Sequence, residues 1–239
     1  MRKSLASLVV AGLGIGTSLP AFAQAVSCIA PSVLPRPRFD GPSKNEPARR
    51  IPTASYTLAI SWSPQSCRSP GPGDALRCGG KLGAFGFTLH GLWPDGAGKI
   101  WPQYCRAAAI LPRAIIRQNI CVTPSPDLIQ HEWAKHGTCM GRDPSAYFAK
   151  SRALYQALRY PDMKALSRRR NLTIGGFVDA LVAVNPAVPA RAVRVTTTKD
   201  GWLDELWLCL DKRFRYKTCK ANQDGGSPSG RKLRIWRAT

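Results

Sequence analysis

Eight cysteines constrain the fold of this 239-residue chain more than any other feature of its sequence. They are Cys28, Cys67, Cys78, Cys105, Cys121, Cys139, Cys209 and Cys219. An even number of cysteines without a C-x2-C pair favours disulfides over a zinc site. Eight cysteines allow roughly a hundred connectivities, so spacing alone does not select the pairing. Cys67 with Cys78, and Cys209 with Cys219, are candidates for short disulfide-closed loops.

The first residues have the three parts of a secretory signal peptide. Residues 1–3 are basic at two positions, the run from Leu5 to Leu19 is apolar and uncharged, and Ala21-Phe22-Ala23 offers a cleavage site. We therefore expect cleavage near Ala23 and export to the periplasm or the medium, where disulfides form. No other run approaches the roughly 20 apolar residues of a transmembrane helix, so no membrane association is expected.

The chain is strongly basic, with 35 Lys and Arg against 14 Asp and Glu and a formal net charge of +21. Such a surface attracts polyanions, and nucleic acid is the first candidate. The alternative is that the charge serves solubility only. The arginine run at 168–170 and the basic tail from Arg231 to Arg237 are candidate phosphate contacts, or solvated faces.

The pattern after residue 23 predicts a Pro-rich basic segment, 24–53, followed by one domain, 54–239. The six prolines between residues 31 and 53 favour an extended, poorly packed segment. Strand patterns lie at 56–62, 85–92, 192–198, 202–210, 213–218 and 232–236. Helix signals lie at 111–120 and 126–136, after the Asp143-Pro144 cap, and from Thr173 to Asn185. This order predicts an α+β fold in which helices pack beside an antiparallel sheet.

All three histidines lie in two short segments, HGLWPD beginning at His90 and HEWAKHGTC beginning at His131. Ser125 is a good N-cap for the second segment and Gly137 a good helix stop. On that helix Glu132 and His136 are i,i+4 neighbours, and His131 and Lys135 form a second such pair.

A metal site and a helix cap are two simpler roles for these histidines. His131 and His136 are five residues apart, whereas the zinc motif H-E-x-x-H places its histidines four apart on one face. We therefore expect no metal and no cofactor. A cation at a helix C-terminus accounts for His136 alone. It leaves His90, His131 and Lys135 unexplained.

The chemistry that fits two imidazoles, a lysine and a carboxylate is phosphoryl transfer with acid–base help. RNA carries its own nucleophile, the ribose 2′-hydroxyl, so one imidazole can act as base and the other as acid. Lys135 would stabilise the charge of the transition state, and Glu132 would orient a neighbouring imidazole.

The paired segments resemble the two active-site motifs of the ribonuclease T2 family. That resemblance implies a secreted, disulfide-bonded, metal-independent endoribonuclease of an α+β fold that cleaves single-stranded RNA with little base specificity. The implied products are 2′,3′-cyclic phosphates and then 3′-phosphate ends. RNA is the expected partner, and a monomer with no obligate protein partner is expected.

The resemblance also implies roles for individual residues. His90 is the implied general acid, His136 the implied general base, and Glu132 and Lys135 the stabilisers of the transition state. Four residues are implied to bind substrate: the phosphate-binding His131, and the base-pocket residues Trp93, Asp95 and Trp101.

The family pattern further implies the disulfides Cys67–Cys78, Cys105–Cys139 and Cys209–Cys219, which leaves Cys28 and Cys121 as the fourth pair. Two competing functional hypotheses remain at this point. One is an inactive polyanion-binding protein on the same fold, and the other is a zinc hydrolase.

Overall fold

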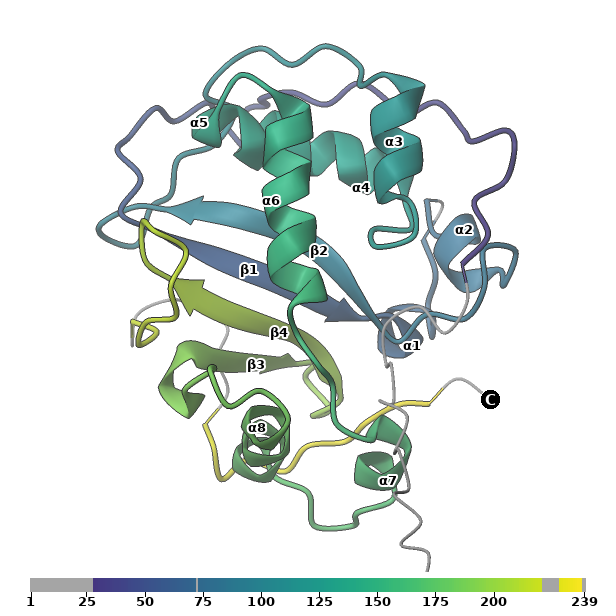
Figure 1. The fold of residues 1–239 in the computed structure, drawn as a ribbon, viewed down its shortest axis with the longest axis vertical. Coiled ribbons are helices and arrows are strands. Elements are labelled where there is room, and N and C mark those ends of the chain that lie inside the picture. Colours follow the sequence, from purple (N-terminus) through teal and green to yellow (C-terminus); the bar gives the residue numbers. More distant parts are fainter. Residues whose placement is uncertain (1–27, 72, 221–227, 238–239) are drawn as a thin grey trace, which may run out of the picture.

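A four-stranded antiparallel sheet forms the centre of the molecule (Figure 1). The computed structural model describes residues 28–71, 73–220 and 228–237, so the predicted signal peptide lies outside the described residues. The strands are β1 (Ser55–Trp62), β2 (Phe87–Asp95), β3 (Val193–Thr197) and β4 (Leu203–Leu210), in the order β2-β1-β4-β3. The α+β architecture predicted from the sequence is confirmed.

The two faces of the sheet differ in chemistry because the side chains of each strand alternate. Leu58 and Ile60 of β1 lie on the buried face with Leu206 and Leu208 of β4. On the other face, Ser61 of β1 pairs with Glu205 of β4 and with Thr88 of β2. The polar face therefore carries the groups that can do chemistry.

A β-bulge interrupts the pairing of β1 with β2 at His90. Ala59 pairs with Gly91 and the next residue, Ile60, pairs with Leu89, so His90 is the extra residue. Bulges redirect a side chain and are frequent beside active sites. Leu89 and His90 already lie on opposite faces, as neighbours on a strand do. The extra residue acts after His90, where it keeps Trp93 opposite Thr57, on the polar face.

The helices are short apart from two. They are α1 (Ser63–Ser66), α2 (Ala75–Cys78), α3 (Arg113–Asn119), α4 (Pro126–His131), α5 (Thr138–Met140), α6 (Pro144–Gln156), α7 (Met163–Ser167) and α8 (Ile174–Ala183). Helix α6 crosses the sheet in front of β1 and β2 (Figure 1). Its Tyr147 and Tyr155 hydroxyls donate to the carbonyls of Leu92 and Phe87, which fixes α6 against β2. None of the helices in the described part of the chain is long and apolar enough to cross a bilayer.

The predicted N-caps of three helices are confirmed. The side chains of Ser125, Asp143 and Thr173 accept hydrogen bonds from backbone amides in the first turns of α4, α6 and α8. These polar side chains satisfy amides that have no partner within the helix, which is why they mark helix starts in a sequence.

Two predicted strands are wrong. Residues 213–218 and 232–236 form only isolated bridges, between Tyr216 and Leu210, Lys232 and Thr173, and Arg234 and Trp202. Each of these segments pairs with another part of the chain at single residues only, so neither forms a strand. Their alternating pattern reflects contact with the core, as at Leu233 and Ile235, which are buried.

The helix predicted over 126–136 is correct only at its start. After α4 the chain widens into a π-helix, η1 (Glu132–Gly137), and continues through α5 to Met140. Gly137 is therefore not a helix stop. A Cβ at Gly137 would overlap a ring carbon of Trp133, so glycine is needed for the close contact of that indole. π-turns are rare and occur frequently at functional sites.

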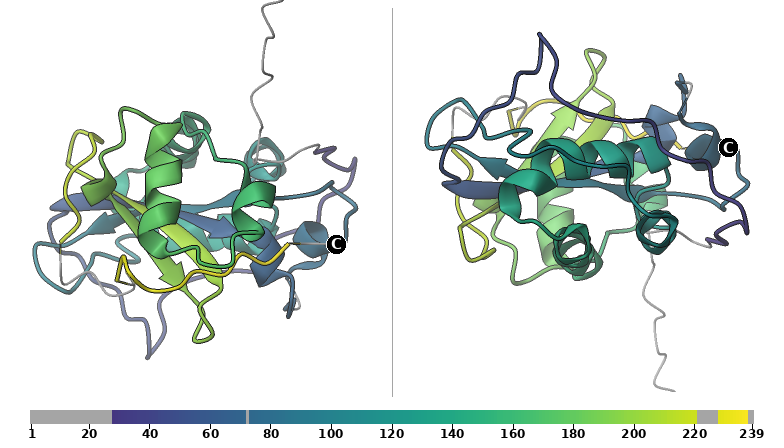
Figure 2. Two further views of the ribbon diagram at one scale, coloured as in Figure 1. Left: turned by 90° about the horizontal axis from the view of Figure 1, so that it is seen from below. Right: turned by 90° about the horizontal axis from the view of Figure 1, so that it is seen from above.

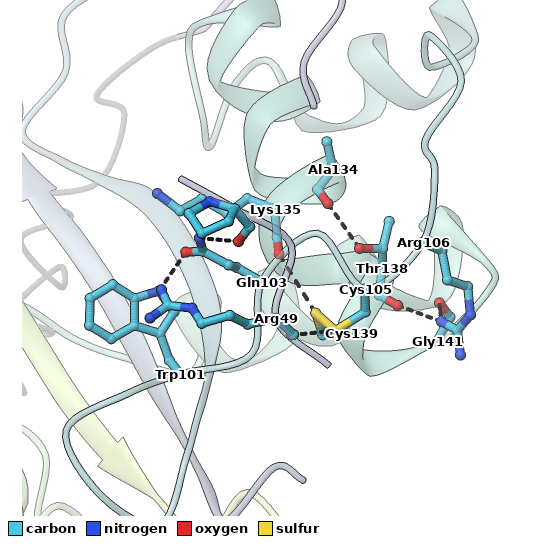
Figure 3. The surroundings of a disulfide bond; sticks show 11 residues. Arg49, Trp101, Gln103, Cys105, Arg106, Ala134, Lys135, Thr138, Cys139 and Gly141 are labelled. Atoms are coloured by element: carbon cyan, nitrogen blue, oxygen red, sulfur yellow. Dashed lines mark hydrogen bonds between the residues drawn. A yellow bond between two sulfur atoms is a disulfide. The ribbon is translucent and has the colours of Figure 1, made fainter. Parts of the chain in front are cut away.

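Four disulfides are present, and the described residues include no free cysteine. They join Cys28 to Cys121, Cys67 to Cys78, Cys105 to Cys139 and Cys209 to Cys219. These are the pairs that the resemblance implies. Cys105–Cys139 holds the loop after Trp101 against α5, beside Lys135 (Figure 3).

The described part of the N-terminal segment is extended but packed against the domain. Leu34 is buried, and Cys28 is tied to Cys121. The segment, drawn in purple, runs along the side of the molecule that carries α3 and α4 (Figures 1 and 2). Its proline content explains why it forms no helix or strand, but it does not make the segment loose.

Candidate active site

Three elements bring the three histidines together on the polar side of the sheet. His90 lies on the bulge of β2, His131 ends α4, and His136 lies in η1. The imidazoles of His131 and His136 have ring centroids 6.3 Å apart. The structure therefore brings the two sequence motifs into one site.

Trp93 lies at the centre of this site. Its ring centroid is 5.0 Å from that of His90 and 5.6 Å from that of His136. Its indole nitrogen donates to Glu132 Oε2 at 3.0 Å. Trp93 therefore contacts both candidate acid–base groups and orients Glu132.

Glu132 lies close to β2 because Gly91 has no side chain. A Cβ at Gly91 would overlap Glu132 Oε2. The other carboxylate oxygen, Oε1, lies 3.5 Å from His90 Nε2. Burial, the largest effect, raises the pKa of Glu132, while the positive charges of His90 and His131 oppose that rise.

His90 is held by Glu205, a residue that the sequence analysis did not single out. Glu205 reaches across β1, and its Oε1 lies 2.6 Å from His90 Nδ1. Burial alone would lower the pKa of His90, but the hydrogen bond and charge of Glu205, with the charge of Glu132, raise it to about 9.

Glu205 is itself fixed by two donors besides His90. The Ser61 hydroxyl donates to Oε1 at 2.7 Å and the Trp207 indole to Oε2 at 2.8 Å. Burial opposes ionisation of Glu205, yet the hydrogen bond and charge of His90, followed by these two hydrogen bonds, lower its pKa to about 2. The carboxylate is therefore ionised and the imidazolium of His90 is favoured at neutral pH.

His136 has the opposite environment. It is 6 % exposed, and no hydrogen bond to its Nδ1 occurs among the described residues. Burial, followed by the positive charges of Lys135, His131 and His90, holds its pKa well below the ordinary value of 6.5. His136 is therefore neutral at neutral pH, while His90 is charged. Two titratable groups with pKa values displaced in opposite directions are typical of an acid–base pair.

Carboxylates of the N-terminal segment contact the two remaining basic side chains of the site. Asp40 Oδ2 lies 2.7 Å from His131 Nδ1, and Glu46 Oε1 accepts from Lys135 Nζ at 2.5 Å. That hydrogen bond is the main cause that lowers the pKa of Glu46. No signal in the sequence marks either carboxylate, because no motif relates residues 40 and 46 to the histidines.

The other two predicted base-pocket residues lie at the margins. Asp95 Oδ2 accepts from the Thr57 hydroxyl at 2.9 Å, which ties the end of β2 to β1. Trp101 is 42 % exposed, and the guanidinium of Arg49 lies 4.7 Å from its ring centroid (Figure 3). These contacts of Asp95 and Trp101 are with groups other than the histidines.

Residues of the two basic runs, 168–170 and 231–237, line one cavity of about 1200 Å³, and none of the three histidines lines it. Three tryptophans, Trp62, Trp202 and Trp236, line it, and no carboxylate is among the described lining residues. Six exposed cations line it as well: Lys164, Arg169, Arg170, Lys232, Arg234 and Arg237. This surface, the basic groove, suits a polyanion.

The cluster of His131, Glu132 and His136 offers donor atoms that a metal ion could bind. One donor atom from each lies within 4.8 Å of the others. In a π-helix, positions i and i+5 are separated by a smaller angle about the helix axis than in an α-helix. The five-residue spacing of His131 and His136 is therefore a weaker argument against a metal site than it is for an α-helix. Zinc bonds of about 2.1 Å place tetrahedral ligands about 3.4 Å apart. A zinc ion at this cluster would need its three ligand atoms at that separation.

Comparison with known proteins shows the family of this chain. Residues 53–219 match the model of the ribonuclease T2 family. The chain belongs to the ribonuclease T2 family. A "Probable ribonuclease" of Haemophilus influenzae is 31% identical over 185 residues, covering 72% of this chain and 63% of the relative. A "Ribonuclease" of Aeromonas hydrophila is 35% identical over 162 residues, covering 66% and 71%.

Solved structures show the same fold. Trichomaglin, described as a novel S-like ribonuclease, superposes with a TM-score of 0.58 at 22% identity, covering 74% of this chain and 96% of its own. RNase NT, solved in complex with 5′-AMP, superposes with a TM-score of 0.56 at 20% identity, covering 77% and 98%. The likeness to these two ribonucleases shows the fold.

Proposed function

We propose that this chain is an endoribonuclease that cleaves single-stranded RNA without a metal ion. The observation that carries the proposal is the pair of imidazoles beside Trp93, one backed by a carboxylate and one buried without a partner for its Nδ1 among the described residues. Membership of the T2 family supports RNA as the substrate.

In the proposed first step, neutral His136 takes the proton of the ribose 2′-hydroxyl. The 2′-oxygen then bonds to the adjacent phosphorus, and the bond from phosphorus to the 5′-oxygen breaks. His90, protonated, gives its proton to that 5′-oxygen. The products are a 2′,3′-cyclic phosphate and a 5′-hydroxyl end, and no outside nucleophile is consumed.

The charge that builds on the phosphoryl oxygens needs nearby cations. Lys135 is the proposed stabiliser, with Glu132 beside it holding the hydrogen bond to Trp93. His131 is the proposed phosphate-binding group. In the second step the two imidazoles exchange roles, water opens the ring, and a 3′-phosphate remains.

The proposed setting is the periplasm or the medium, for a monomeric enzyme with little base preference. Four disulfides favour an oxidising compartment. Base stacking on an exposed indole such as Trp101 tolerates every base, which supports low specificity.

The first prediction concerns products and metal dependence. RNA is expected to yield 2′,3′-cyclic phosphates early in a digest, because the first step is intramolecular and outruns hydrolysis. DNA and 2′-O-methyl RNA, which lack the nucleophile, are expected to stay intact. ³¹P NMR of digests with and without EDTA measures both effects.

Each outcome of that experiment has one meaning. Cyclic phosphates with EDTA present support the proposed mechanism. Cleavage lost with EDTA and restored by zinc would favour a metal at His131, Glu132 and His136 instead. Absence of cleavage would favour an inactive polyanion-binding protein.

The second prediction concerns the basic groove. Replacing both Arg169 and Arg170 by glutamine is expected to lower the affinity for an uncleavable 2′-O-methyl RNA by about 3- to 10-fold, and to reduce the slope of log affinity against log salt by about 0.7 per lost phosphate contact. Fluorescence anisotropy at several salt concentrations measures both quantities. The control replaces Arg113 and Arg213, which are exposed and do not line the groove. Equal losses in the two variants would show that only net charge matters.

A further inference from the structure

We propose that residues 38–49, the strap, act as an intramolecular competitor of RNA at the active site. This inference rests on the proposed function, because it concerns the regulation of the same site. It is carried by contacts of the strap with three groups expected to face the RNA: His131 and Trp101, implied to bind substrate, and Lys135, implied to stabilise the transition state.

Two of these contacts place carboxylates where phosphates are expected. Asp40 Oδ2 lies 2.7 Å from His131 Nδ1, and Glu46 Oε1 lies 2.5 Å from Lys135 Nζ. A carboxylate and a phosphate offer the same feature to these cations, an anionic oxygen that accepts a charge-assisted hydrogen bond. A phosphate can therefore take either position only when the carboxylate leaves it.

The third contact places a planar cation where a base would stack. The guanidinium of Arg49 lies 4.7 Å from the centroid of the Trp101 ring. Figure 3 shows Arg49 beside this indole, with the Trp101 nitrogen bonded to Gln103. Guanidinium groups and bases use the same face of an indole. The strap thus occupies two phosphate positions and one base position with a single stretch of chain.

Tyr104 joins the two carboxylates of the strap into one unit. Its hydroxyl lies 2.9 Å from Asp40 Oδ1 and 3.3 Å from Glu46 Oε2. Its backbone amide donates to the carbonyl of Lys135 at 2.8 Å, so the tyrosine is fixed to η1. Release of one carboxylate therefore weakens the hold on the other.

Both ends of the strap are anchored outside the catalytic groups. At one end Arg38 binds Asp127 through its amide at 2.8 Å and through Nε at 2.9 Å. At the other end Arg49 exchanges two backbone hydrogen bonds with Gln103, of 2.8 and 3.0 Å. The residues between these anchors are mostly exposed, and Phe39 is 73 % exposed. The strap can therefore lift from the site while the anchors hold its ends.

Competition of this kind lowers the apparent affinity by the fraction of molecules whose site is open. If each of the two carboxylate contacts is as strong as an ordinary exposed ion pair, together they favour the closed site over the open one by a factor of about 2 to 30. RNA carries many phosphates, which together can displace both strap carboxylates. A single phosphate has to displace a carboxylate without the help of neighbouring contacts. The proposal therefore predicts a preference for polymeric RNA over short products.

The test replaces both strap carboxylates, Asp40→Asn with Glu46→Gln. The double variant is expected to bind 2′-O-methyl RNA about 2- to 30-fold more tightly and to have a lower KM for RNA, with kcat unchanged. The matched control, Asp179→Asn with Asp200→Asn, removes the same charge from two exposed positions. A gain in affinity that the control also shows, or a fall in kcat without a gain, would overturn the proposal.

A second measurement uses the unaltered protein. Saturating 2′-O-methyl RNA is expected to increase hydrogen–deuterium exchange in peptides that cover residues 39–48. Unchanged or slower exchange there would show that the strap stays in place and would contradict the proposal. Both experiments use an uncleavable ligand, so they give an answer even if no RNA is cleaved. If RNA is cleaved but the strap variant binds RNA no more tightly, only the proposal about the strap is rejected. If the strap variant binds RNA more tightly but no RNA is cleaved, only the proposed ribonuclease activity is rejected.

Discussion

Replacing His136 by alanine is expected to lower the rate of RNA cleavage by about 10²- to 10⁴-fold, the usual contribution of one general acid–base group. The reason is the environment of His136. Burial and three neighbouring positive charges hold its pKa well below 6.5, so its imidazole is neutral and can take the 2′-hydroxyl proton at neutral pH. His90→Ala is expected to cost a similar factor, because it removes the proton donor. Initial rates on a short single-stranded RNA measure both.

These variants need controls for folding and for binding. Thermal unfolding and the affinity for 2′-O-methyl RNA are expected to change little, since neither imidazole carries a large share of the core. Free imidazole in the buffer is expected to restore part of the rate of each alanine variant. If either variant kept more than about a tenth of the original rate, the acid–base assignment would be wrong.

The residues of this acid–base pair could be named from the sequence because each lies in a short contiguous segment. Within HEWAKHGTC the residues Glu132, Lys135 and His136 are separated by less than two helical turns, so any helical form of the segment keeps them together. HGLWPD likewise places His90 and Trp93 on one strand. Local chain geometry thus settles which groups are available.

The opposite pKa values of the two histidines could not be predicted in this way. The helix end and Glu132 would raise an imidazole pKa and Lys135 would lower it, and sequence alone does not weigh these effects. The structure separates them through non-local contacts. Glu205 is 115 residues from His90 and reaches it only because β4 lies beside β1.

Neither the strap nor the π-turn could be predicted from the sequence, and the reasons are related. A Pro-rich basic segment such as 24–53 is typical of a loose linker, and only tertiary contacts show Asp40 and Glu46 against the site. η1 has the composition of an ordinary α-helix, so its sequence does not predict the wider π-turn. In η1 the carbonyl of Lys135 accepts from the Tyr104 amide, a contact made by a loop about 30 residues away.

Glu205→Gln is expected to move the alkaline limb of the pH–rate profile downward by about 1–3 pH units. The proposed mechanism needs protonated His90 and neutral His136, so the rate of the unaltered enzyme is expected to stay high up to the His90 pKa of about 9 and to fall above it. Glutamine keeps an acceptor for His90 Nδ1 but removes the negative charge. Burial lowers the His90 pKa, and in this variant the charge of Glu132 is the only negative charge left to oppose that effect. At pH 8 the rate is expected to drop by about 2- to 100-fold, and near pH 6 about half of it or more is expected to return.

The return of activity at low pH separates an electrostatic role of Glu205 from a structural one. If Glu205 merely supported β4 through Ser61 and Trp207, the loss in Glu205→Gln would be the same at every pH. The control Asp200→Asn removes one charge from an exposed turn before β4 and is expected to leave the profile in place. An unchanged alkaline limb in Glu205→Gln would show that the high pKa of His90 does not depend on this carboxylate. The general acid would then need another source of its proton at alkaline pH, and Glu132, 3.5 Å from His90 Nε2, would be the next carboxylate to replace.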